Sequence, residues 1–236
     1  MKTYLQCLTA GALAASLQLL PAAEISGKVK LSGTPPAEIT ITPGTLCGPN
    51  PKPLATRFYL TGADSGLGNV FVYIKNPPAG KTYSPPAETA VLDQVNCEYQ
   101  PYVMAVMANQ KLAIRNSDPF MHNVNTSSSP NASHRFNLAQ SIKGTEHVKS
   151  FDKTELPVRF LCNVHNWMYA YVGVFDHPYF AVTDKDGKFK LPADLPAGKY
   201  TLAVKHMKAG ESTQEITVAD GEKKSVEFTL SVPAPK

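Results

Sequence analysis

The sequence predicts an all-β fold. Short runs rich in β-branched and aromatic residues recur along the chain, and clusters of glycine, proline, asparagine and aspartate separate them. The 236 residues include 15 glycines and 20 prolines, which indicates many turns. Regularly spaced short strands of this kind are typical of sandwiches and barrels.

The individual strands are predicted from runs of apolar residues that lie between turn residues. In chain order these runs are Ile25–Leu31, Val70–Lys75, Val103–Met107, Lys111–Asn116, Val158–Cys162, Tyr171–Phe175, Lys188–Leu191, Tyr200–His206, Glu215–Val218 and Ser225–Leu230. The dipeptide Asp186-Gly187, between Phe180–Thr183 and Lys188–Leu191, predicts a β-hairpin, because both residue types tolerate the positive φ of a tight two-residue turn.

Composition and charge exclude several classes of protein. The chain has 23 Lys and Arg against 19 Asp and Glu, for a formal charge of +4, and only 18% of its residues are charged. So small an excess provides no basic stripe, which argues against nucleic acid as a partner. A hydrophobic share of 43% argues against disorder, and the length allows one large or two small domains.

Residues 1–23 are predicted to be a secretory signal peptide. Lys2 supplies the positive start, Leu8–Leu20 is an apolar stretch, and Pro21–Ala23 offers small residues for cleavage before Glu24. The apolar stretch is too short for a comfortable membrane span, and no other stretch could provide one. We therefore expect an exported protein, periplasmic or extracellular, with no membrane span.

Three cysteines follow the predicted cleavage site, because Cys7 leaves with the signal peptide. Unpaired cysteines are unusual in an oxidising compartment. Either two of Cys47, Cys97 and Cys162 form a bridge and one thiol is left over, or a metal ion takes the odd thiol.

Four residues with the spacing of metal ligands lie near predicted strand ends. Cys162, His165 and Met168 follow an apolar strand at a Cys-x2-His-x2-Met spacing, and His122 comes shortly after the strand that ends at Asn116. Two imidazoles, a thiolate and a weak thioether are the donors of a blue-copper electron-transfer site. Zinc is a poorer match, because thioether is not among its usual ligands.

These segments resemble the cupredoxin family, which includes plastocyanin, amicyanin and azurin. The stretch Tyr102–Asn116, followed by His122-Asn123-Val124, looks like the strand pair that leads to the first copper histidine, and the Cys162–Met168 loop has the short spacing of amicyanin. The resemblance covers Leu92–Phe175 and implies a Greek-key β-sandwich. It also implies one type 1 copper, with four ligands: His122, Cys162, His165 and Met168.

The same resemblance implies two further features. The side chain of Asn123 would tie the two ligand loops together. With Cys162 taken by copper, Cys47 and Cys97 are free to pair, and a bridge between them would close a long loop.

From Phe180 onward the chain is similar to the carboxypeptidase regulatory-like (transthyretin-like) β-sandwich. Thr183–Phe189 matches its Thr-Asp-x-x-Gly-x-Phe turn, and Leu195–Tyr200 matches its Leu-Pro-x-Gly-x-Tyr turn. We therefore divide the mature chain into an N-terminal β segment (24–91), a cupredoxin-like copper domain (92–177) and a second small β-sandwich (178–236). The N-terminal segment either packs with the C-terminal unit or completes the cupredoxin sheet.

The favoured function is that of an exported one-electron carrier that meets a redox partner protein transiently. His165 is expected to present its ring edge at the surface as the electron exit, with Trp167 and Met121 forming an apolar docking patch. An enzyme is not expected, because four ligands leave no open position, and the chain has only six histidines and no His-x-His pair. His177 and His206 either lie near the metal or are structural.

Two alternatives come from other classes. The first is copper storage, delivery or sensing, although methionines such as Met104 and Met107 are scattered rather than clustered. The second is a non-redox cell-surface β-sandwich that acts as a binding module and has a degenerate copper site. The complete set of four ligands argues against degeneracy.

Overall fold

The computed structural model describes residues 23–127, 130, 134–192 and 194–234. The predicted signal peptide therefore lies outside the described residues, apart from Ala23. Nearly all regular structure is β, so the all-β prediction is confirmed. No helix in the described part of the chain is long and apolar enough to cross a membrane.

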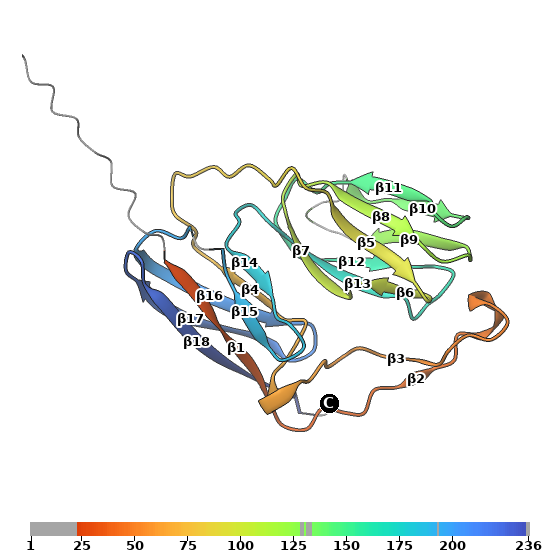
Figure 1. Cartoon of the computed structure of the whole chain (residues 1–236), viewed down its shortest axis with the longest axis horizontal. Coiled ribbons are helices and arrows are strands. Elements are labelled where there is room, and N and C mark those ends of the chain that lie inside the picture. The colour runs from red at the N-terminus through yellow and green to blue at the C-terminus, as the bar shows by residue number, and fades with distance from the viewer. Residues whose placement is uncertain (1–22, 128–129, 131–133, 193, 235–236) are drawn as a thin grey trace, which may run out of the picture.

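The first of two sandwiches, the terminal sandwich, combines strands from both ends of the chain (Figure 1). One sheet has the order β15 (Lys188–Lys190), β1 (Glu24–Ser32), β18 (Lys223–Ser231). The other has the order β14 (Phe180–Val182), β4 (Phe71–Ile74), β16 (Gly198–His206), β17 (Gly210–Val218). Strand β1 runs parallel to β18 over its full length, so the beginning and the end of the described chain lie side by side.

The second sandwich, the central sandwich, is built from the residues between β4 and β14. Its five-stranded sheet has the order β10 (Asn137–Gln140), β9 (His122–Ser127), β12 (Glu155–Leu161), β13 (Tyr169–Phe175), β7 (Val103–Met107). Its four-stranded sheet has the order β11 (Glu146–Lys149), β8 (Leu112–Asn116), β5 (Ala90–Val95), β6 (Glu98–Gln100).

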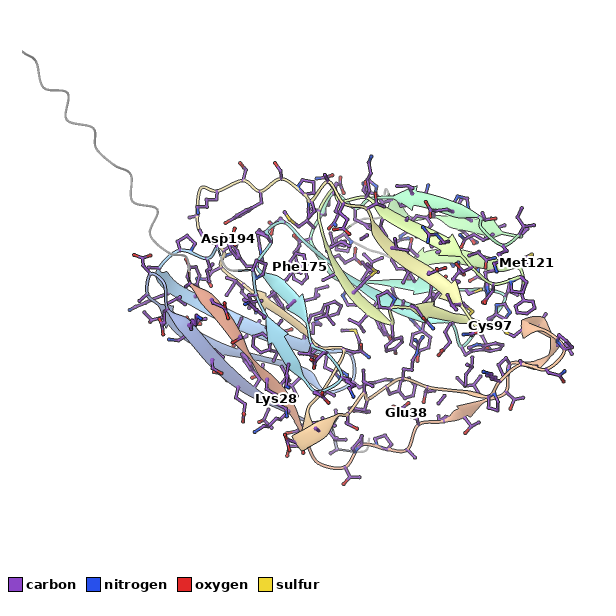
Figure 2. All side chains as sticks on the ribbon, viewed as in Figure 1. Lys28, Glu38, Cys97, Met121, Phe175 and Asp194 are labelled. Carbon is purple, nitrogen blue, oxygen red and sulfur yellow. A yellow bond between two sulfur atoms is a disulfide. The ribbon has the colours of Figure 1, made fainter. Side chains whose placement is uncertain are left out.

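Hydrophobic alternation explains how each sandwich forms. In β18, Val226, Phe228 and Leu230 are buried and the residues between them are exposed, as expected for a sheet with one face in water. The two sandwiches have separate cores, and a smaller cluster that includes Phe71 and Phe175 joins them. Figure 2 shows Phe175 between the two halves of the molecule.

An extended arm, residues 38–58, runs from the terminal sandwich along the central sandwich (Figure 1). It contains the short strands β2 (Thr40–Ile41) and β3 (Leu54–Ala55), which pair with each other, and between them the 3-10 turn η1 (Gly44–Cys47). The carboxylate of Glu38 accepts hydrogen bonds from the backbone N–H groups of Phe58 and Tyr59, which closes the base of the arm. A second 3-10 turn, η2 (Ala63–Ser65), follows the arm.

The hairpin predicted at Asp186-Gly187 is wrong. The two flanking strands belong to different sheets, since β14 pairs with β4 and β15 pairs with β1. The residues do form a tight turn, in which the Asp184 carboxylate accepts the N–H groups of Asp186 and Lys188. This turn carries the chain around a corner from one sheet to the other.

His177 and His206 belong to neither ligand loop. His177 packs between the rings of Phe175 and Tyr179, and the ring of His206 lies 5.4 Å from that of Tyr59. Within the described residues, no group of candidate metal donors includes either histidine. Their positions fit the structural alternative.

The burial of His206 predicts that acid destabilises the fold. Its buried Nδ1 accepts the N–H groups of Lys208 and Ala209, and burial, followed by the charge of Lys208, lowers the pKa of His206 from 6.5 to about 4. The unfolded chain protonates His206 more readily than the folded chain does. The contribution of His206 to the free energy of unfolding is therefore complete above pH 6.5 and is lost as the pH falls toward 4.

We expect His206 to account for a loss of about 2–3 kcal/mol between pH 7 and pH 4.5. Urea unfolding of the parent protein and of His206→Gln at both pH values measures this loss. The variant should lose less stability than the parent by that amount, and equal losses in both proteins would contradict the assignment.

Candidate metal centre

Three of the four predicted ligands lie together at one end of the central sandwich. Nδ1 of His122 and Nδ1 of His165 are 3.1 Å apart, and the Cys162 Sγ lies 3.5 Å from the latter and 3.9 Å from the former. The side chains are buried, with exposures of 0% for both histidines and 3% for Cys162. The group therefore offers one thiolate and two imidazole nitrogens to a single point that is shielded from water.

The neighbouring strands position these donors. His122 is the first residue of β9, and Cys162 directly follows the last residue of β12. The loop from Cys162 to Met168 is closed at its base, because Cys162 N–H donates to the Met168 carbonyl and Met168 N–H donates to the His165 carbonyl. Met168, the fourth predicted ligand, is buried at the end of this loop.

The side chain of Asn123 ties the two ligand loops together, as the resemblance implied. Its Oδ1 accepts the N–H of Asn163 at 2.7 Å, and its own backbone N–H points at the Cys162 Sγ from 3.5 Å. Burial raises the pKa of the Cys162 thiol, but the contacts of its sulfur with the rings of His122 and His165 outweigh burial and lower the pKa to about 5. The site therefore favours the thiolate, the form of cysteine that binds metals.

Asp118 is a site residue that the sequence analysis missed. Its Oδ2 lies 2.9 Å from Nε2 of His122, and the carboxylate also accepts the N–H groups of Asn96 and Cys97. Burial raises the pKa of Asp118, but these hydrogen bonds lower it below its usual value overall. A carboxylate here holds the proton on Nε2, so that the lone pair of Nδ1 faces Cys162.

The loop that carries Asp118 is itself held by Asn116. The Asn116 side chain accepts the Asp118 N–H and donates to the carbonyl oxygens of Phe120 and Gln140. The sequence did contain a signal, because Asp118 precedes His122 by one short loop and metal-bound histidines commonly donate to a carboxylate.

Asp118→Asn is expected to weaken metal binding by the His122, Cys162 and His165 group about 10- to 100-fold, because the amide orients His122 less well than the carboxylate does. Competition with a chromophoric chelator measures the affinity. Asp152→Asn is the matched control, since the Asp152 Oδ1 lies 3.1 Å from Nε2 of His134, which is outside the donor group. Equal affinities for the two variants would argue against a role for Asp118 at the site.

The expected exposure of His165 is wrong. Its side chain is 0% exposed, because the tip of the arm lies against the ring edge that was expected to face solvent. Cys47 in the arm forms a disulfide with Cys97, and Nε2 of His165 lies 3.9 Å from the Cys97 Sγ. Trp167 packs on the same ring, and its indole N–H donates to the Cys97 carbonyl.

Met121 is exposed, as expected for a surface patch, with a relative accessibility of 52% for the residue. Figure 2 shows Met121 and Cys97 toward the same end of the central sandwich, which is the end that the arm reaches. The disulfide also confirms that Cys47 and Cys97 pair, and Cys162 is the free cysteine of the described residues.

No protein-family model matches the chain, and no curated protein matches its sequence. Several solved structures are similar to part of it. A Cu-containing nitrite reductase (NirK) from Thermus scotoductus SA-01 is 15% identical over 43% of this chain and 26% of its own, with a TM-score of 0.35. This chain thus spans about a quarter of that enzyme.

Two further similar structures are cupredoxins. A purple cupredoxin from Nitrosopumilus maritimus is 17% identical over 36% of this chain and 97% of its own, with a TM-score of 0.31. An oxidised mutant of amicyanin is 16% identical over 44% of this chain and 97% of its own, with a TM-score of 0.34.

Proposed function

We propose that this chain is an exported type 1 copper protein that carries one electron at a time. The observation that supports the proposal is the convergence of the Cys162 Sγ, His122 Nδ1 and His165 Nδ1 in a buried site. A soft thiolate with two imidazoles fits copper better than it fits a hard cation. These three residues would hold the ion, with Met168 as a weaker fourth ligand. When bound, copper supplies a Cu(II)/Cu(I) couple.

The residues around the donors keep the site rigid and dry. Asp118 fixes the ring orientation of His122, and the Asn123 side chain holds the Cys162 loop in place. The closed backbone of the Cys162–Met168 loop limits movement of the thiolate. A site with little freedom to rearrange lowers the cost of changing the charge at its centre.

We propose further that the chain does not turn over a substrate itself. All three donors are at most 3% exposed, which leaves no approach for a substrate to the metal. The partner would be a redox protein that docks transiently, since such encounters are small. The disulfide accords with export through the predicted signal peptide. The terminal sandwich would be the carboxypeptidase regulatory-like unit.

Copper storage or delivery is the second candidate. The burial of His165 favours it, because a carrier that uses an exposed imidazole edge for electron exit would not cover that edge. Redox cycling at a defined potential distinguishes a carrier from a storage or delivery protein. A binding module with a degenerate site would not retain copper at all.

The decisive experiment is the visible absorption spectrum of the mature protein loaded with Cu(II), beside that of Cys162→Ser. An intense thiolate-to-copper band is expected in the parent and should be absent from the variant, since serine offers no thiolate. Voltammetry of the parent should then show a reversible one-electron wave. A colourless parent that does not bind copper would overturn the proposal.

A further inference from the structure

A second group of candidate metal donors lies on the other edge of the His165 ring. The sulfur atoms of Cys47 and Cys97 and one ring nitrogen of His165 all lie within 4.8 Å of one another, and all three residues are buried. Nδ1 of the same ring faces Cys162 and His122, whereas Nε2 faces Cys97. One imidazole therefore lies between two sets of donors.

Nε2 of His165 has poor partners as long as the bridge is intact. Within the described residues its hydrogen-bond contact is the Cys97 Sγ at 3.9 Å, and a disulfide sulfur is a weak acceptor. Buried polar atoms normally have stronger partners than this. The nitrogen thus points at two sulfur atoms that are not available to a metal in the oxidised state.

Reduction would change these sulfur atoms into strong ligands, because the thiolate is the form of cysteine that binds metals. A partner protein that carries two thiols can supply the electrons for this reduction. Its thiolate attacks one sulfur of the bridge, the bond between Cys47 and Cys97 breaks, and the dithiol leaves as a disulfide. Two electrons and two protons pass to the bridge, which becomes two thiols.

The reductant has a route to the bridge. Cys47 lines a surface pocket of about 340 Å³, together with residues of the arm and of the Asp118 loop. Cys47 is 9% exposed and Cys97 is fully buried, so attack at Cys47 would release the Cys97 thiolate beside His165. Cys47 lies in the short turn η1, so its sulfur can adjust without breaking a sheet.

We infer that Cys47, Cys97 and His165 form a second copper site, for monovalent copper, which opens when a protein dithiol reduces the bridge. Two soft thiolates suit Cu(I), and burial keeps water away from the ion. When the first site is also filled through Nδ1, Nε2 binds the second ion by releasing its proton to solvent, and His165 then bridges the two sites as an imidazolate. Asp118 is not needed as a ligand, because its carboxylate is already bonded to His122, Asn96 and Cys97. The inference goes beyond the proposed function, since it holds whether or not the first site carries electrons.

Anaerobic titration with Cu(I) against a competing chromophoric chelator tests the inference. The parent protein is compared with its bridge intact and after reduction by a phosphine that is then removed. We expect one tightly bound equivalent with the bridge intact and two after reduction. The reduced double variant Cys47→Ser/Cys97→Ser should bind one equivalent, and reduced Cys162→Ser should also bind one.

X-ray absorption of the copper in reduced Cys162→Ser gives an independent reading, because two sulfur donors are expected and Cys162 is absent. The comparison of intact and reduced parent protein needs no variant, and circular dichroism shows whether the reduced protein keeps its β structure. One equivalent in both states of a folded parent would overturn the inference, and so would a second equivalent that persists in the double serine variant.

Failure of the proposed function would give a different pattern of copper uptake from failure of the second site. If the first site does not bind copper, the intact parent takes up none and the reduced parent takes up one, which the double serine variant loses. That pattern supports the second site alone. A first site without a second gives one equivalent before and after reduction.

Discussion

Replacing both bridge cysteines, Cys47→Ser together with Cys97→Ser, is expected to lower the free energy of unfolding by about 3–5 kcal/mol. The two cysteines are separated by 50 positions in the chain, so the bridge closes a long loop and restricts the unfolded state. It also joins the tip of the arm to the turn between β5 and β6, which fixes the arm against the central sandwich.

Urea unfolding of the copper-free proteins measures this loss. The parent protein reduced by a phosphine is the control, because it lacks the bridge but keeps both sulfur atoms. Reduced parent and double variant should lose similar amounts of stability. A loss below about 1 kcal/mol would show that the arm is held by its other contacts and that the bridge constrains little.

Gly187→Ala is expected to destabilise the fold strongly, by more than about 3 kcal/mol. Gly187 has a φ of +77°, which costs a residue with a side chain about 1–2 kcal/mol. A Cβ at this position would also lie 2.2 Å from the Val29 carbonyl oxygen and 2.7 Å from the Leu67 nitrogen. These are backbone atoms of β1 and of the segment before β4, so they cannot rotate away as a side chain could.

Gly210→Ala is the matched control for this collision. Gly210 has a similar φ of +83°, but a Cβ there would have nothing within 4 Å. The control should therefore show only the backbone cost of about 1–2 kcal/mol. Thermal and urea unfolding of both variants separate the two effects. Equal losses of stability in the two variants would mean that β1 shifts easily and that the turn at Asp186-Gly187 is not tightly packed.

Much of the fold could be predicted from hydrophobic runs. The predicted strand Val103–Met107 has the bounds of β7, and most other predicted strands agree within a few residues. Most of the missed strands are polar or short, although β5 (Ala90–Val95) is neither. β9 reads His-Asn-Val-Asn-Thr-Ser and β11 reads Glu-His-Val-Lys, so neither has the apolar content that marks a strand in isolation. Their pairing with β12 and β8 determines their structure.

The grouping of His122, Cys162 and His165 could be predicted because residue type and spacing indicate a shared site. Their surroundings could not, because they depend on contacts between distant parts of the chain. The contact of Asp118 with Cys97 and the position of the arm over His165 arise from tertiary packing. The hairpin prediction failed for a related reason. A turn sequence determines the local bend but does not determine which sheet each flanking strand joins.

Each sheet of the terminal sandwich combines strands from before and after the central sandwich, and this arrangement affects how the molecule would respond to proteolysis. The segment 75–89, which links β4 to β5, contains no strand. A single cut there would leave β1 and β4 on one fragment, still paired with β14, β15, β16 and β18 on the other. The Cys47–Cys97 bridge would also join the two fragments covalently. The nicked protein would therefore migrate as one species until it was both reduced and denatured.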